Sequence, residues 1–477
     1  MAVDFRGHPM FAQRGFNAPT RFEADIYDCE VWGEIPSEIE GTFYRLQCDF
    51  AYPPPENEWF TGFNGDGHVS AFRFANGSVD FKARYIKTYR LMTERRHRRR
   101  LWGVYRNHFT DDPLVAEVDR GAANTHLYWH GGKLLVLKED ALPYYIDPVT
   151  LETYGSWDFH GKWTATSMSA HPKIDPVTGE MIAYSYQANG DLSDDIAVYT
   201  VNQAGHITNE VWLKSPYLGI IHDIAITQKY IVIPVIARTT SLERLQSGEP
   251  MWEWNGDLPT MVGLLPRDGD ASDVRWFQGP ARNTLHFLNA MDDGNRVVMD
   301  LPVSDTERSP SQIKRWIFDM NSRDDRFGEE VVSTANGVLA RMDDRYLSLP
   351  YRYGFVGNSD PGLPFDAERA GGPRRTTNTY VRYDLRDNNE SVFYVGDVQS
   401  LQESGFVPRK GGTEEGDGYI MGVANNYEEM ASELHIVDAS RMEEGAVAVV
   451  KLPFRLRGGT HVNWFSAAEL AEQEAEV

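Results

Sequence analysis

Short runs of alternating apolar and polar residues, separated by tight turns, recur along most of this 477-residue chain. In segment 68–88, two such runs flank Asn76-Gly77, a pair that supplies the positive φ angles of a type I′ hairpin turn. Segment 124–159 holds four strand-like runs in about 36 residues, the size of one propeller blade. Convincing amphipathic helices are few. The pattern predicts an all-β fold, a closed β-propeller, and its length is compatible with six to eight blades.

No compositional break divides the chain, so we expect a single domain over residues 1–477. Residues 1–20 and 466–477 are expected to be peripheral tails. The proline-rich stretch 52–59 and the Gly/Pro/Arg-rich stretch 358–377 are expected to be long loops and not domain linkers.

The charge balance limits the classes of partner. Lys and Arg number 47 against 70 Asp and Glu, which gives a formal net charge of −23 and argues against a broad nucleic-acid surface. Neither a signal peptide nor a stretch of about 18 apolar residues is visible, so we expect a cytoplasmic protein without a transmembrane segment. The basic run 94–100, with arginines from Arg95 to Arg100, predicts a solvated loop or helix face. Contact with acidic lipid head groups is the weaker alternative.

Histidine is the only residue type present that offers several soft nitrogen ligands. Cys29 and Cys48 are the only cysteines, too few for a disulfide framework or a cysteine-based zinc site. Of thirteen histidines, four share one context, beside short strands and chain reversals with small or polar neighbours: His171, His222, His286 and His461. No function is expected for His97, His130, His160 and His206.

Ordered motifs run from about residue 20 to residue 465. Four contain the histidines: AHPKIDPVTGEM, HDIAIT, HFLNA followed by acidic residues, and LPFRLRGGTHVNW. Six more are EIEGTFYR, FNGDGHV, YRNHFTDDP, ANTH, KEDALPYYIDP and EEGDGYI. Together these motifs resemble those of the carotenoid cleavage oxygenases, and more narrowly those of the branch that cleaves lignostilbene, resveratrol and isoeugenol.

This resemblance implies a seven-bladed propeller, with a cap of loops and short helices over an axial non-haem Fe(II) site. Its ligands would be the four histidines of the shared context, and Thr125 would crowd one of the positions open to O₂. Glu139 and Glu403 match two of the three glutamates that orient the ligands in the family. The third glutamate aligns with Val338, so the partner of one ligand, by family order His286, is expected to be a water or a backbone carbonyl.

The same resemblance implies the substrate contacts. Tyr105 and Lys138 would bind the 4-hydroxyl group of a phenolic alkene, and Phe63 would stack near its ring. A buried ammonium favours the phenolate, which pushes electrons into a conjugated alkene. The implied reaction is an O₂-dependent scission of the conjugated alkene double bond into two carbonyl products, without an organic cofactor. Stilbene and propenylphenol substrates both remain open. So do an apocarotenoid-cleaving dioxygenase, a non-catalytic propeller scaffold, and the oligomeric state, including a homo-oligomer.

Overall fold

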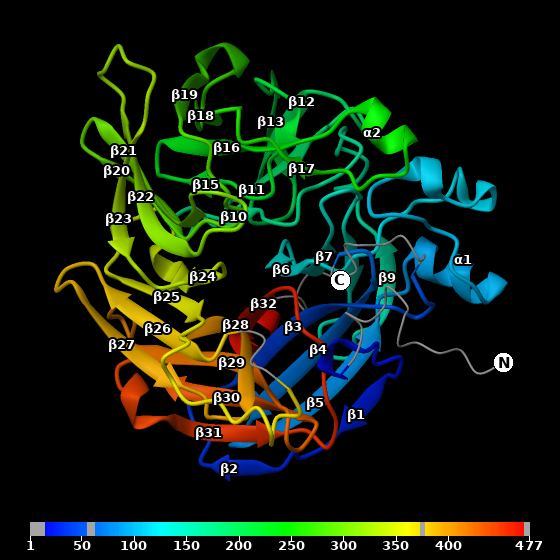
Figure 1. Cartoon of the computed structure of the whole chain (residues 1–477), viewed down its shortest axis with the longest axis vertical. Coiled ribbons are helices and arrows are strands. Elements are labelled where there is room, and N and C mark those ends of the chain that lie inside the picture. Colours follow the sequence, from blue (N-terminus) through cyan, green and yellow to red (C-terminus); the bar gives the residue numbers. More distant parts are fainter. Residues whose placement is uncertain (1–14, 55–62, 373–376, 472–477) are drawn as a thin grey trace.

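The computed structural model describes residues 15–54, 63–372 and 377–471, and within them seven β-sheets stand around one central axis (Figure 1). Paired strands within each sheet run antiparallel. Examples are His126–His130 with Lys133–Leu137, Met181–Tyr186 with Asp195–Val201, and Arg296–Ser304 with Ser311–Asp319. The all-β propeller prediction is therefore confirmed. The number of blades is seven, which the resemblance implies and the strand periodicity alone leaves at six to eight.

We number the blades in the order of their first inner strands. Blade 1 contains β1 (Ala24–Ile26), β3 (Gly41–Asp49), β4 (Asp66–Ala75), β5 (Ser78–Tyr85) and β32 (Val462–Ser466). Blade 2 contains β6 (His126–His130), β7 (Lys133–Leu137), β8 (Tyr144–Ile146) and β9 (Thr153–Ser156). Blade 3 contains β10 (Lys173–Ile174), β11 (Met181–Tyr186), β12 (Asp195–Val201) and β13 (Ile207–Lys214).

The remaining four blades follow around the ring. Blade 4 contains β14 (Gly219–Ile220), β15 (Ala225–Ile226), β16 (Tyr230–Thr239), β17 (Glu253–Trp254), β18 (Thr260–Pro266) and β19 (Arg275–Gly279). Blade 5 contains β20 (Asn289–Asp293), β21 (Arg296–Ser304), β22 (Ser311–Asp319) and β23 (Gly328–Ser333). Blade 6 contains β24 (Ala340–Met342), β25 (Tyr353–Asn358), β26 (Thr379–Asp384) and β27 (Asn389–Tyr394). Blade 7 contains β28 (Gln399–Pro408), β29 (Gly418–Asn426), β30 (Ala431–Asp438), β31 (Ala446–Lys451) and β2 (Val31–Gly33).

Strands from both ends of the chain close the ring. The C-terminal strand β32 pairs with β3 of blade 1, from Gly41 opposite Ser466 to Arg45 opposite Val462. The N-terminal strand β2 pairs with β31 of blade 7. Each junction joins residues more than 400 positions apart, so the ring closes only when both ends of the chain have paired with it.

The predicted hairpins form where the turn residues require them. Asn76 and Gly77 have φ angles of 53° and 77°, and they connect β4 to β5 with Ala75 opposite Ser78. Gly131 and Gly132 make the corresponding turn between β6 and β7, with φ angles of 56° and 66°. Strands β6 to β9 then make up the whole of blade 2, as expected for segment 124–159.

The basic run lies partly on a helix. Helix α1 (Tyr89–His97) is capped by the Thr88 side chain, which accepts from the Leu91 N–H. Arg99 lies 2.7 Å from Asp112, and Arg100 lies 3.4 Å from the buried Glu94. Arg95, Arg96 and His97 lie on the outer side of the helix, half-buried or exposed, whereas Glu94 is buried. Two of the following arginines have acidic partners within the protein. The other helices, α2 (Leu242–Gln246) and α3 (Ala467–Ala471), are short. Within the described ranges, no helix has the length and apolarity needed to cross a membrane.

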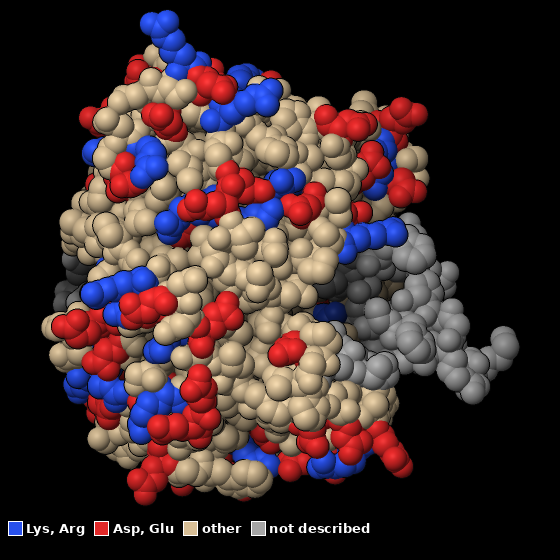
Figure 2. All heavy atoms as spheres, turned by 60° about the vertical axis from the view of Figure 1, so that its left-hand side comes forward, with Lys and Arg blue, Asp and Glu red and all other residues tan. Residues whose placement is uncertain are grey.

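The two segments expected to be peripheral tails contain residues that line the cavity or pack into the fold. Asn17 lines the central cavity described below. Ser466 ends β32, and Leu470 of α3 packs against an apolar cluster that blades 1 and 2 share. Residues 1–14 and 472–477 of these tails, with 55–62 and 373–376 of the two expected loops, lie outside the described residues. On the surface, acidic and basic side chains are interspersed over the face that Figure 2 shows.

Candidate metal centre and substrate cavity

The four histidines of the shared sequence context stand at equivalent positions in four blades. His171, His222, His286 and His461 precede β10, β15, β20 and β32 by one to three residues. β10, β20 and β32 are edge strands of their sheets, and β15 pairs with β16 alone. Figure 1 shows β10, β15 and β32 around the centre of the ring. Residues up to 290 positions apart are thereby brought together, as the prediction requires.

The imidazoles form one compact cluster. Their ligand nitrogens all lie within 4.8 Å of one another. Ring centroids are 4.7 Å apart for His171 and His222 and 4.8 Å apart for His286 and His461. Metal–nitrogen bonds of about 2.1 Å place opposite ligands about 4.2 Å apart, so the span is close to that of four donors around one ion. Four imidazoles suit a borderline divalent metal such as iron and add no negative charge.

The electrostatic environment favours the neutral form that a metal ligand needs. Burial, and then the neighbouring imidazoles, lower the pKa of His171 and His286 well below 6.5. A neutral imidazole offers a lone pair to a cation without first releasing a proton. The donor set therefore fits a divalent metal.

Glu139 orients His222. It follows β7 by two residues, and its Oε2 lies 2.7 Å from Nδ1 of His222. Although burial alone would raise it, the pKa of Glu139 is held well below its usual range by His222, Arg106 and Lys138. An ionised carboxylate on Nδ1 fixes the tautomer and directs Nε2 of His222 toward the cluster.

Glu403 holds His461 in a related way. Both of its carboxylate oxygens lie 3.2 Å from Nδ1 of His461, and one accepts the Val462 N–H at 2.8 Å. The register of β28 and β29 shifts between Leu401 and Ser404, so Glu403 lies in an irregular part of the strand. Such irregularities re-aim side chains, and here the carboxylate faces the axis.

His286 is held through its backbone. Among the described residues no side chain hydrogen-bonds to its ring, and Val338 stands where the resemblance places a glutamate. The neighbouring Phe287 N–H instead donates to Oδ2 of Asp223 at 3.0 Å. Lys173 pairs with the other oxygen of Asp223 at 2.7 Å. This buried ion pair fixes the segment that carries His286.

Tyr105 binds the second oxygen of Glu139. Its hydroxyl donates to Oε1 of Glu139 at 2.6 Å, and Arg106 lies 3.5 Å from the same oxygen. Burial and the nearby carboxylate raise the pKa of Tyr105 well above its ordinary value, so the phenol keeps its proton. Its oxygen still has lone pairs that can accept a further hydrogen bond.

Lys138 and Phe63 lie beside Tyr105. The Lys138 Nζ stands 4.6 Å from the centroid of the Tyr105 ring and donates to the Phe63 carbonyl at 3.1 Å. The rings of Phe63 and Tyr105 have centroids 6.2 Å apart. An ammonium has three donors, so the bond to Phe63 leaves donors for another acceptor. The three side chains expected at a substrate phenol thus form one group.

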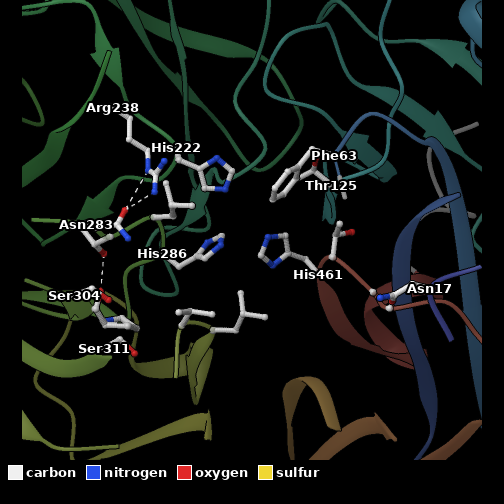
Figure 3. A pocket seen from close by; sticks show the side chains of 18 of the residues that line it. Asn17, Phe63, Thr125, His222, Arg238, Asn283, His286, Ser304, Ser311 and His461 are labelled. Carbon is white, nitrogen blue, oxygen red and sulfur yellow. Dashed lines mark hydrogen bonds between the residues drawn. The ribbon is translucent and has the colours of Figure 1, made fainter. Parts of the chain in front are cut away.

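A cavity of about 510 Å³ reaches the cluster, a size typical of small-molecule sites. Figure 3 shows His222, His286 and His461 at its centre, with Phe63 and Thr125 on one side. Thr125 directly precedes β6 and donates its hydroxyl to Asn124 at 3.0 Å. Thr125 thus lies on the cavity wall, in the same lining as three of the four histidines.

A fifth axial histidine was not expected from the sequence. His126, the residue after Thr125, is buried, and its ring centroid lies 4.6 Å from that of His461. Neither of its ring nitrogens has a hydrogen-bond partner within the part of the protein that the structure describes. The ANTH motif contains this residue, and its position at the start of an inner strand was the available signal. Asp223, Lys173 and Arg106 were also missed. Each lies in a motif quoted above, but its role depends on a partner far away in the chain.

The four histidines for which no function is expected do not belong to the cluster. His130 is buried at the end of β6, with Nε2 3.3 Å from the Gly179 carbonyl. His97 ends α1, and the rings of His160 and His206 pack together at the surface with centroids 5.2 Å apart. The two cysteines are free and buried.

Comparisons with known proteins agree with this geometry. A family model described as retinal pigment epithelial membrane protein matches residues 17–466. The chain is 38% identical to isoeugenol monooxygenase of Pseudomonas putida, covering 98% of this chain and all of the relative. It is also 38% identical to resveratrol cleavage oxygenase 1 of Aspergillus fumigatus, covering 100% and 99% of the two chains. The crystal structure of a lignostilbene dioxygenase from Pseudomonas brassicacearum superposes with a TM-score of 0.93 at 38% identity, covering 98% of this chain and 100% of that one.

Proposed function

Because the chain belongs to the family of the retinal pigment epithelial membrane protein, the carotenoid cleavage oxygenases, we propose that it cleaves the conjugated alkene double bond of 4-hydroxyphenyl alkenes with O₂. The products would be two carbonyl compounds, such as vanillin from isoeugenol. The observation that carries the proposal is the group formed by Lys138, Tyr105 and Phe63 beside the histidine cluster.

His171, His222, His286 and His461 would hold Fe(II), with Glu139 and Glu403 orienting two of them. When bound, the iron would supply the binding and activation of O₂. Thr125 would restrict the open coordination positions, because it lines the same cavity as three of the histidines.

The protein's own residues would bind and polarise the substrate phenol. Tyr105 donates to Glu139, so its oxygen would accept a hydrogen bond from the substrate hydroxyl. Lys138 would donate to the substrate oxygen and favour the phenolate by its charge. A phenolate releases electron density through the ring into the alkene. Phe63 would pack against the ring and help to exclude water from the reacting bond.

An aerobic assay with three alkenes tests the proposal. The iron-loaded protein is incubated with isoeugenol, resveratrol and an apocarotenal, and aldehydes are quantified by mass spectrometry. We expect aldehydes from one or both phenols and an unchanged apocarotenal. Iron-depleted protein serves as the control. Cleavage of the apocarotenal with both phenols intact would overturn the assignment, because the lysine and tyrosine would then have no phenol to bind.

A further inference from the structure

The cavity has a second polar end, away from Phe63. Arg238 at the end of β16, Asn283 before β20 and Ser304 at the end of β21 all line it. Figure 3 shows these three side chains on the side opposite Phe63 and Thr125, with the histidines between. We call Arg238, Asn283 and Ser304 the distal oxygen subsite. None of the motifs that suggest a phenol-binding role contains these residues.

Hydrogen bonds fix the orientation of Asn283. Its Oδ1 accepts from Nε and Nη2 of Arg238, at 3.2 Å and 3.1 Å. A guanidinium has only donors, so the amide oxygen must face it and the amide nitrogen must face away. In Figure 3 that nitrogen points into the cavity. No acceptor for it is found among the described residues, so it presents two N–H groups to a ligand.

The backbone around the subsite is rigid. The backbone N–H of Asn283 donates to the Ser304 carbonyl at 2.9 Å, and the backbone N–H of Ser304 donates to the Asn283 carbonyl at 2.9 Å. Thr284 donates its hydroxyl to the Pro302 carbonyl at 2.7 Å. These bonds join the segment before β20 to the end of β21, so the donors are held in place before a ligand arrives.

The charge of Arg238 is only partly compensated. Its Nη1 lies 3.2 Å from Oε1 of Glu307, whose side chain is 44% exposed, while that of Arg238 is 16% exposed. A solvated carboxylate screens a mostly buried guanidinium incompletely, because water weakens the attraction. The distal oxygen subsite therefore combines donors with positive charge.

We propose that the distal oxygen subsite binds a carboxylate carried by the substrate across the alkene from its 4-hydroxyphenyl group. The inference rests on the proposed function and specifies its substrate class. A propenylphenol has only a methyl group beyond the alkene, which gives these donors nothing to bind. A stilbene carries a second ring there, and a carboxylate on that ring supplies the acceptor and the charge. The preferred substrates are then stilbenes with an acidic second ring.

Anaerobic binding measurements test this preference without turnover. The ligands are 4-hydroxystilbene and its derivatives with a carboxylate at the 3′ or 4′ position, and Kd is obtained from quenching of tryptophan fluorescence. Of the two carboxylate derivatives, the one with the lower Kd should bind iron-loaded wild type at least about tenfold more tightly than the unsubstituted stilbene. This factor is typical of a hydrogen bond between charged groups. Arg238→Gln should abolish this ratio, and Asn283→Asp should reverse it by replacing donors with a negative acceptor.

Arg244→Gln is the matched control. Arg244 lies in the same blade, its side chain is 17% exposed, and it pairs at 2.7 Å with the exposed Glu253, yet it does not line the cavity. Arg244→Gln should keep the wild-type ratio of the Kd values for unsubstituted and carboxylated stilbene. An equal ratio in wild type and Arg238→Gln would overturn the inference. A ratio that depends on Arg238, in a protein that releases no aldehyde in air, would preserve the subsite and refute the cleavage reaction instead.

Discussion

The Tyr105 hydroxyl lies 2.6 Å from Oε1 of Glu139, and both side chains are buried. The other oxygen of that carboxylate lies 2.7 Å from Nδ1 of His222. One glutamate thus joins Tyr105, the proposed phenol contact, to His222, a proposed iron ligand. A change in the position of Glu139 would therefore affect both side chains.

Tyr105→Phe should separate these two roles. The variant keeps the ring but loses the hydroxyl that meets both Glu139 and the substrate phenol. We expect kcat/KM for phenolic alkenes to fall about ten- to a hundredfold, the loss of one hydrogen bond to a charged group. Iron content should stay near that of wild type, because His222 keeps Glu139. Tyr44→Phe is the control, since the Tyr44 hydroxyl is equally buried and donates to the Pro148 carbonyl. A wild-type kcat/KM in Tyr105→Phe would show that the Tyr105 hydroxyl does not contact the substrate.

Lys138→Met should weaken recognition of the free phenol. Wild type is expected to prefer a 4-hydroxystilbene over its 4-methoxy ether, because only the former can become a phenolate beside an ammonium. The preference, measured as a ratio of kcat/KM values, should fall at least about tenfold in the variant. Lys133→Met, at the other end of β7, removes a lysine that packs over Trp157 and should leave the ratio intact. An unchanged ratio in Lys138→Met would contradict the assigned contact.

Asp223→Ala should increase the rate at which the protein loses bound iron. It removes the acceptor of the Phe287 N–H, which fixes the segment of His286. We expect iron transfer to a chelator to accelerate about tenfold, as for other groups that orient metal ligands. Asp175→Ala is the control, because Asp175 is also buried and pairs with Arg267 away from the cluster. If both variants lose iron at the wild-type rate, His286 does not depend on Asp223.

The cysteines should not react in the folded protein. Burial, with a smaller contribution from the charge of Asp80, raises the pKa of Cys29 to about 11, and burial also raises the pKa of Cys48. At pH 8 both sulfurs remain thiols, whereas alkylation requires the thiolate. Mass spectrometry after iodoacetamide should therefore show no adduct on native protein and two on denatured protein. Rapid labelling of the native form would show that a thiol is accessible and ionised.

The parts of the fold that follow from local chemistry could be predicted. Asn76-Gly77 specifies its hairpin because both residues accept positive φ. The strand runs of segment 124–159 form one blade for the same local reasons. The number of blades and the pairing of β32 with β3 depend on contacts across the whole protein, and alternation in sequence does not encode them.

The site shows the same division. His171, His222, His286 and His461 each lie in a distinctive local motif, and these motifs led to the cluster. Asp223 acts through a backbone N–H 64 positions away, and Arg238 acts through Asn283, 45 positions away. Such partners come into contact only because the folded ring brings distant segments of the chain together. His126 was missed although it lies in the ANTH motif, because a single histidine after a threonine does not have the sequence context that the four clustered histidines share.

One measurement tests the central claim most directly, namely that the four-histidine cluster holds the iron that cleaves a phenolic alkene. Iron content, O₂ consumption and aldehyde formation are measured together on wild type and His461→Ala with resveratrol and isoeugenol. We predict stoichiometric iron in wild type, with O₂ and alkene consumed in equal amounts and two carbonyl products formed. His461→Ala should lose both iron and turnover. Aldehyde formation by metal-free wild type, or stoichiometric iron retained in an active His461→Ala, would contradict the account.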